Sequence, residues 1–109
     1  MDWGIAGTGK IAHKFLDTIE KMEGERIVAV GSRRKESAEA FISPRPGIIA
    51  HGSYSDLFRD QRVEAVYIAV PNTLHYALIK EALEKGKHVL SEKPMTLSPL
   101  EMSALYRLA

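Results

Sequence analysis

Short apolar runs alternate along the chain with longer segments in which apolar residues recur at helical spacing. Continuous apolar runs are typical of strands that helices cover on both faces of a sheet. Five such runs occupy residues 3–6, 27–30, 48–50, 65–70 and 88–90. Between the first two, apolar residues recur every three or four positions from Ile11 to Met22, which predicts an amphipathic helix.

Further helices are predicted in the other connections. The apolar spacing from Leu74 to Leu83 predicts a long helix, with Gly86 as its C-cap. At residue 98 a capping serine, a proline at the first helical position and a glutamate three residues after the cap form a strong helix start. Shorter helical segments are predicted over residues 35–41 and, for one or two turns, over residues 55–58.

This alternation predicts an α/β fold of the Rossmann type. Right-handed crossovers make a doubly wound parallel sheet with strand order 3-2-1-4-5 the natural arrangement. The 109 residues correspond to one domain, which we assign to residues 1–109. Ligands of such sheets lie at the carboxyl ends of the strands, near the switch point between the first and fourth strands.

The composition limits the classes of partner. Fifteen basic and fourteen acidic residues leave a formal net charge of +1, too small a field to indicate nucleic acid or a membrane surface as a partner. The absence of cysteine excludes disulfides and thiolate metal sites, and we assign no metal ligands. No apolar run has the length of a signal peptide or a membrane span. We therefore expect a cytoplasmic protein.

A glycine-rich motif follows the first apolar run and opens the first helix. Residues 7–12, GTGKIA, match the Gly-x-Gly-x-x-Ala form of the dinucleotide fingerprint. Gly7 permits a tight turn, and Gly9 lets the backbone approach a pyrophosphate that the helix N-terminus attracts. A glycine-rich turn without a ligand is the alternative, and the position between strand and helix favours binding. The candidate contacts are Gly7, Thr8, Gly9, Lys10 and Ile11, although the Lys10 side chain is typical of a solvated helix position.

The residues at the end of the second strand bear on the choice of cofactor. An acidic residue about 20 positions past the third small residue of the fingerprint usually binds the adenosine ribose. Counting from Ala12 leads instead to Ser32, followed by Arg33 and Arg34. A carboxylate would repel a 2′-phosphate, whereas a hydroxyl and a guanidinium donate hydrogen bonds to it. The sequence therefore favours NADP over NAD, and a solvated basic loop is the alternative.

Later motifs add a family resemblance. Residues 69–75 (AVPNTLH) end the fourth strand, residues 91–94 (SEKP) end the fifth, and residues 52–57 (GSYSDL) follow the third. With the phosphate loop, they resemble the N-terminal domain of the family named for glucose-fructose oxidoreductase, inositol dehydrogenase and rhizopine-catabolism proteins. The resemblance extends from Trp3 to Leu105. Within the family, the pattern is most similar to dihydrodiol dehydrogenases and NADP-linked sugar dehydrogenases.

The resemblance implies roles for individual residues. Lys93 would be the active-site lysine beside nicotinamide and substrate, where an ammonium can polarise a carbonyl oxygen as hydride arrives. Glu92 would lie on the cofactor side of the cleft. Pro71, Asn72 and His75 would lie at the nicotinamide end. Taken without the family, Asn72 is typical of a helix cap and His75 of a solvated residue in a first turn.

The implied activity is hydride transfer between a nicotinamide cofactor and a sugar, a polyol or a related carbonyl or alcohol. Family members are much longer and carry a second, substrate-binding domain. We therefore expect this chain to be a cofactor domain that lacks the C-terminal substrate domain, ends before a sixth strand and is inactive alone. A stand-alone dinucleotide-binding or sensing module is the alternative. The fifth strand would then form an exposed edge, through which we expect homo-oligomers.

Overall fold

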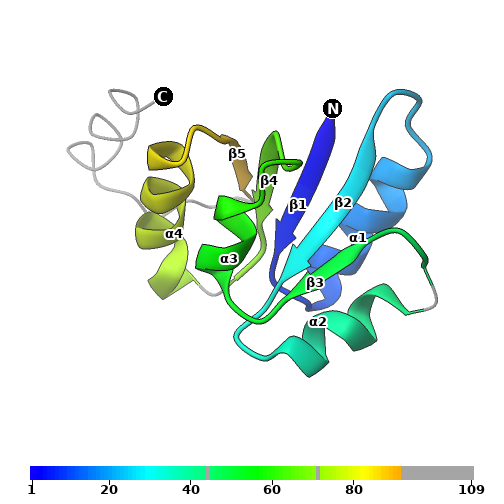
Figure 1. The fold of residues 1–109 in the computed structure, drawn as a ribbon, viewed down its shortest axis with the longest axis horizontal. Helices are drawn as coiled ribbons and strands as arrows, with labels where there is room; N and C mark the ends of the chain where they lie inside the picture. Colours follow the sequence, from blue (N-terminus) through cyan, green and yellow to red (C-terminus); the bar gives the residue numbers. More distant parts are fainter. Residues whose placement is uncertain (44, 71, 92–109) are drawn as a thin grey trace.

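A five-stranded sheet forms the centre of the molecule, with strand order β3-β2-β1-β4-β5. The computed structural model describes residues 1–43, 45–70 and 72–91 (Figure 1). Every neighbouring pair of strands is parallel, so the predicted doubly wound sheet and its strand order are confirmed. The strands are β1 (Asp2–Ala6), β2 (Arg26–Gly31), β3 (Ile49–His51), β4 (Ala65–Ile68) and β5 (His88–Ser91).

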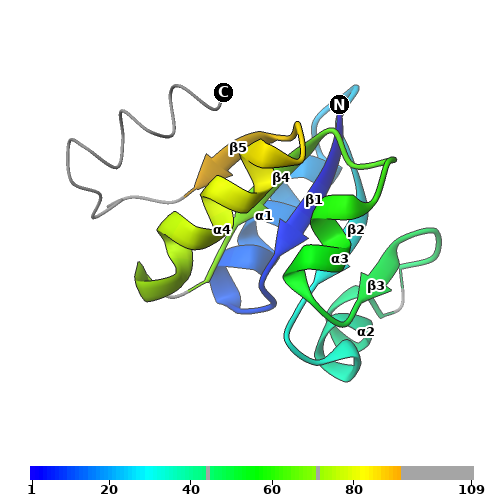
Figure 2. The same ribbon diagram turned by 60° about the vertical axis from the view of Figure 1, so that its left-hand side comes forward.

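Helices cover both faces of this sheet. They are α1 (Lys10–Glu20), α2 (Lys35–Ile42), α3 (Tyr54–Arg59) and α4 (Asn72–Glu84). The helices α1 and α2 pack on one face, and α3 and α4 pack on the other (Figures 1 and 2). Gly86, with φ of 79°, follows α4 as predicted of a C-cap. The helix predicted from residue 98 lies outside the described residues.

Several predicted boundaries differ from the structure by one or two residues. The fourth strand ends at Ile68 rather than Val70, because β1 ends at Ala6, the partner of Ile68. The third strand is displaced by one residue, to Ile49–His51. The helix of one or two turns predicted over residues 55–58 is confirmed as α3, whose six residues begin one position earlier and end one position later.

Each face of the sheet has its own hydrophobic core. On the first face, α1 buries Ala12, Leu16 and Ile19, the stripe that the sequence predicts. Phe15 stacks on Tyr67 with ring centroids 4.0 Å apart. On the second face, the buried residues include Val28, Leu57, Phe58, Val66, Ile68 and Ile79.

The helix α3 lies especially close to the sheet. A Cβ atom added at Gly31 would lie 2.9 Å from the Cβ atom of Leu57. Glycine at the end of β2 therefore lets α3 pack directly against the strand, and the position of this strand end depends on the position of α3.

Residues 1–43, 45–70 and 72–91 show no features of a membrane-spanning helix or of a metal site. Within these ranges, no helix has the length and apolar character needed to cross a membrane. In the same ranges, no group of three or more histidine, cysteine, aspartate or glutamate side chains is placed to hold a metal ion.

Candidate functional site

The turn from β1 into α1 lies at the carboxyl edge of the sheet. Gly7 has φ of 120°, in a region that L side chains rarely adopt. Its N–H donates to the carbonyl of Gly31 at 2.9 Å, which joins the turn to the end of β2. A Cβ atom at Gly7 would overlap the carbonyl oxygen of Ala69. The fold itself therefore requires glycine at this position.

Gly9 has a different environment. Its φ of −86° and ψ of −168° are open to any residue, and an added Cβ atom would meet nothing within 4 Å. Neither the backbone conformation nor the packing of the described residues requires glycine here. Its absent side chain leaves free space in front of α1, as a bound diphosphate would need.

The N-terminus of α1 carries no side chain that competes for this space. No side chain caps the helix at Gly9, and its first turn contains no acidic residue. The first four N–H groups of a helix have no partner within it, and the helix dipole adds partial positive charge there. Lys10 and Ile11 are exposed, and Thr8 is partly buried. The residues present therefore fit the diphosphate of a dinucleotide.

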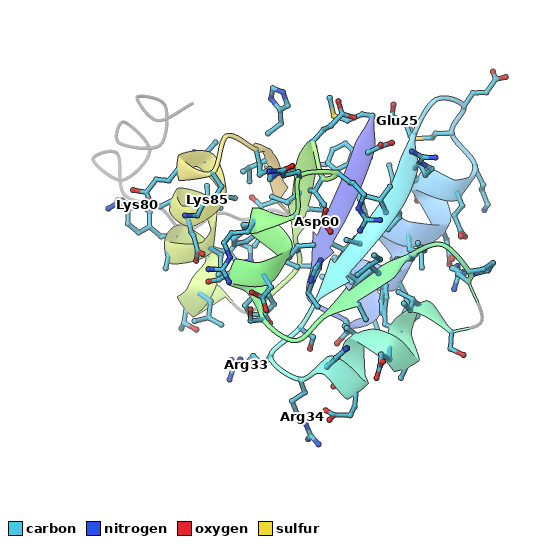
Figure 3. All side chains as sticks on the ribbon, viewed as in Figure 1. Glu25, Arg33, Arg34, Asp60, Lys80 and Lys85 are labelled. Atoms are coloured by element: carbon cyan, nitrogen blue, oxygen red, sulfur yellow. The ribbon has the colours of Figure 1, made fainter. Side chains whose placement is uncertain are left out.

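The end of β2 supplies the predicted cofactor-discriminating residues. Ser32 is buried, and its N–H donates to the carbonyl of His51 at 3.2 Å. Arg33 and Arg34 are exposed and extend outward from the turn between β2 and α2 (Figure 3). Arg34 lies 3.8 Å from Glu36 in a solvated ion pair. A serine and two arginines thus stand where an acidic residue would bind a ribose diol.

His75 differs from the solvated residue that its first-turn position indicates. It is only 5% exposed, and its Nε2 atom lies 2.6 Å from the carbonyl oxygen of Val70. Since a carbonyl can only accept, Nε2 carries the proton. The buried Nδ1 atom has no hydrogen-bond partner among the described residues. His75 therefore ties α4 to the end of β4. Asn72 begins α4, and Pro71, Glu92 and Lys93 lie outside the described residues.

One further pair of residues joins the end of β3 to the residue that follows α3. The Nε2 atom of His51 lies 2.9 Å from Oδ2 of Asp60, whose side chain is 8% exposed. The Arg62 guanidinium, and after it His51, hold the pKa of Asp60 well below its usual value in spite of burial. No motif signals this pair, because the two residues meet only when α3 folds between them.

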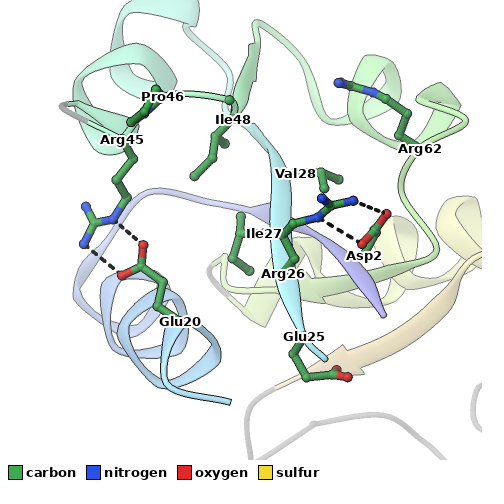
Figure 4. Close-up of a pocket in the computed structure, with 11 residues that line it drawn as sticks. Asp2, Glu20, Glu25, Arg26, Ile27, Val28, Arg45, Pro46, Ile48 and Arg62 are labelled. Atoms are coloured by element: carbon green, nitrogen blue, oxygen red, sulfur yellow. Dashed lines mark hydrogen bonds and ion pairs between the residues drawn. The ribbon is translucent and has the colours of Figure 1, made fainter. Parts of the chain in front are cut away.

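The opposite edge of the sheet contains a half-open hollow with a volume of about 650 Å³. Figure 4 shows two ion pairs in its wall, between Arg26 and Asp2 at 3.0 Å and between Arg45 and Glu20 at 2.8 Å. None of the predicted cofactor residues lines it. It lies at the amino ends of the strands, where doubly wound sheets do not bind their ligands, and its arginines already have carboxylate partners.

The parallel sheet and the open phosphate loop together define a dinucleotide-binding domain of the Rossmann type. A protein-family model described as an oxidoreductase family with an NAD-binding Rossmann fold, GFO/IDH/MocA, matches residues 1–109. The chain belongs to this family, which confirms the resemblance inferred from the motifs.

Known relatives are much longer than this chain. A D-xylose 1-dehydrogenase (NADP(+)) of Haloferax volcanii is 37% identical over 107 residues, 97% of this chain and 33% of the relative. A trans-1,2-dihydrobenzene-1,2-diol dehydrogenase of Mus musculus is 35% identical over 102 residues, 92% of this chain and 31% of the relative.

The fold is similar to that of KijD10, a 3-ketoreductase from Actinomadura kijaniata solved in complex with TDP-benzene and NADP. The TM-score is 0.92 at 34% identity, over 100% of this chain and 34% of that one. This chain therefore spans about a third of the length of these proteins.

Proposed function

We propose that this chain is the NADP-binding domain of an oxidoreductase that transfers hydride between nicotinamide and a sugar, a polyol or a related carbonyl or alcohol. The observation that carries the proposal is the open start of α1, where Gly9 leaves space that the fold does not use. The backbone of Gly7, Thr8, Gly9, Lys10 and Ile11 would bind the diphosphate.

The preference for NADP rests on the turn after β2. The hydroxyl of Ser32 and the guanidinium groups of Arg33 and Arg34 would donate hydrogen bonds to the 2′-phosphate. The relatives support this preference, since the Haloferax enzyme is named for NADP(+) and KijD10 was solved with NADP.

The nicotinamide end of the site would lie beyond β4 and β5. Bound nicotinamide supplies or accepts the hydride. Pro71 and Asn72 would line its pocket. The buried His75 would fix the turn after β4 through its hydrogen bond to the Val70 carbonyl. By family resemblance, Glu92 would lie on the cofactor side and Lys93 would polarise the reacting oxygen.

The chain's relationship to a longer protein is also part of the proposal. Its relatives are about three times as long as this chain, and we place the substrate domain in their additional residues. These 109 residues would therefore bind the cofactor without turnover. The outer strand β5 would form a contact between copies of the chain, to which Leu90, 47% exposed, would contribute. A cysteine-free sequence is compatible with a cytoplasmic setting.

Calorimetric titration of the chain with NADP⁺ and NAD⁺ tests the cofactor assignment. Arg33→Ala should weaken NADP⁺ binding by roughly 1.5–3 kcal/mol, the range for hydrogen bonds to charged groups, and should leave NAD⁺ binding nearly unchanged. Arg26→Ala is the matched control, because Arg26 is an exposed arginine at the opposite edge of the sheet. Equal losses for the two cofactors, or tighter binding of NAD⁺ by the wild type, would contradict the assignment.

A further inference from the structure

The end of β3 supports the turn that carries the candidate 2′-phosphate residues. Gly31 pairs with His51 in the last register position of β2 and β3. The N–H of the next residue, Ser32, then donates to the His51 carbonyl at 3.2 Å. The two strands end at Gly31 and His51. In the described residues, the bond from Ser32 to His51 is the last backbone hydrogen bond between the β2 and β3 segments before Arg33.

The ring of His51 is itself fixed by a buried carboxylate. Oδ2 of Asp60 lies 2.9 Å from His51 Nε2 and 2.9 Å from Nη2 of Arg62. Oδ1 accepts from the Arg62 backbone N–H at 3.0 Å and from its Nε at 3.2 Å. Four contacts thus hold the carboxylate in one orientation, and the ionised Asp60 is a fixed acceptor for the His51 ring.

These two residues stand on either side of α3. His51 precedes the helix and Asp60 follows it, so their contact closes the segment that contains α3; we call this pair the α3 clamp. The same helix presses Leu57 against Gly31, where an added Cβ atom would lie 2.9 Å from the Leu57 Cβ. The α3 clamp therefore acts on the end of β2 in two ways, through the His51 backbone and through Leu57.

We propose that the α3 clamp positions the 2′-phosphate-binding turn and so sets the preference for NADP over NAD. This inference rests on the proposed function and adds His51 to it as a positioning residue. Arg33 and Arg34 are exposed, and the only ion pair of Arg34 in the described residues, with Glu36, is loose at 3.8 Å. Long solvated side chains of this kind reach a phosphate reproducibly only when their backbone is held in place.

The test measures the ratio of the NAD⁺ and NADP⁺ dissociation constants by calorimetry. His51→Phe removes the donor to Asp60 and should lower the preference for NADP⁺ about tenfold, the order of magnitude of one misplaced charge-assisted hydrogen bond. NAD⁺ affinity should fall by less than NADP⁺ affinity, since the diphosphate loop is joined to the end of β2 only through the bond from the Gly7 N–H to the Gly31 carbonyl. His51→Gln keeps an N–H donor at a similar distance from the backbone and should retain most of the preference.

Glu20→Gln is the control, because it weakens an ion pair with Arg45 at the opposite edge and should not change the ratio. A merely structural role for His51 would weaken both cofactors together, and that result would overturn the inference. If circular dichroism shows that His51→Phe does not fold, Asp60→Asn replaces it. It should likewise lower the preference for NADP⁺ and affect NAD⁺ affinity less. A preference that survives loss of the α3 clamp overturns this inference alone, whereas a wild type without preference overturns the proposed cofactor as well.

Discussion

The helices α1 and α3 both begin at the carboxyl edge of the sheet, but their N-termini differ. In α3, the side chain of Ser53 accepts the N–H of Asp56 at 3.0 Å, and Asp56 also pairs with Arg59. In α1, no side chain caps Gly9 and no acid lies in the first turn. A six-residue helix depends on its caps, whereas the eleven-residue α1 is stabilised by its buried stripe.

This difference shows that α3 caps its N-terminus with its own side chains, whereas α1 does not. In α3, Ser53 accepts one of the first N–H groups, and the Asp56 carboxylate lies in the first turn, at the positive end of the helix. The first N–H groups of α1 face the open space before Gly9. Since packing rather than capping stabilises α1, its N-terminus is available for an anion at little cost to folding.

The largest change in the free energy of unfolding is expected at Gly7, in the turn before α1. Gly7→Ala should destabilise the chain by more than about 3 kcal/mol, because a positive φ and an overlap with the Ala69 carbonyl act together. Urea unfolding followed by circular dichroism measures this loss. An alanine variant of near wild-type stability would show that the turn is looser than the structure indicates.

Gly9→Ala should instead reduce binding. Its stability should change by no more than about 1 kcal/mol, since the conformation suits any residue and the added methyl meets nothing. Dinucleotide affinity should fall by on the order of 2 kcal/mol for NADP⁺ and NAD⁺ alike, because the methyl would separate the diphosphate from the helix N–H groups. Unchanged affinity in the titration would place the diphosphate elsewhere.

A smaller effect is expected at the capped helix. Ser53→Ala removes the acceptor of the Asp56 N–H and should destabilise the chain by about 1 kcal/mol, as loss of an N-cap usually does. NADP⁺ affinity should stay within about twofold, because the α3 clamp still holds the helix. Urea unfolding and calorimetry on the same preparation separate the two quantities. A loss of NADP⁺ affinity as large as that of Gly9→Ala would contradict the view that only the N-terminus of α1 serves binding.

The fold and the phosphate loop could be predicted because each depends on neighbours in sequence. The stripe of Ala12, Leu16 and Ile19 is a local periodicity, and the glycine motif follows a strand directly. The sequence also separates the tight turn at Gly7 from the approach of a pyrophosphate at Gly9, but it could not reveal the Ala69 carbonyl that a Cβ atom at Gly7 would overlap. The same residue type is required by a tertiary contact at one position and leaves space at the other.

Residues whose environment arises only on folding were harder to predict. His51 matches no motif, because its partner Asp60 lies beyond α3 and the two residues meet only on folding. His75 seemed solvated from its place in a first turn, yet the start of α4 turns its ring toward the Val70 carbonyl. Glu92 and Lys93 lie outside the described residues, so their roles stay predictions from the family resemblance.

The aromatic group beneath α1 gives the chain a built-in optical probe. Trp3 is the single tryptophan of the sequence; its ring lies edge-on to Phe15 at 5.2 Å, and its indole N–H donates to Glu25 at 2.8 Å. Unfolding would expose this indole to water and change its fluorescence. Because Trp3 lies toward the amino end of β1, away from Gly9, its emission would follow the packing of β1 against α1 rather than occupancy of the phosphate loop.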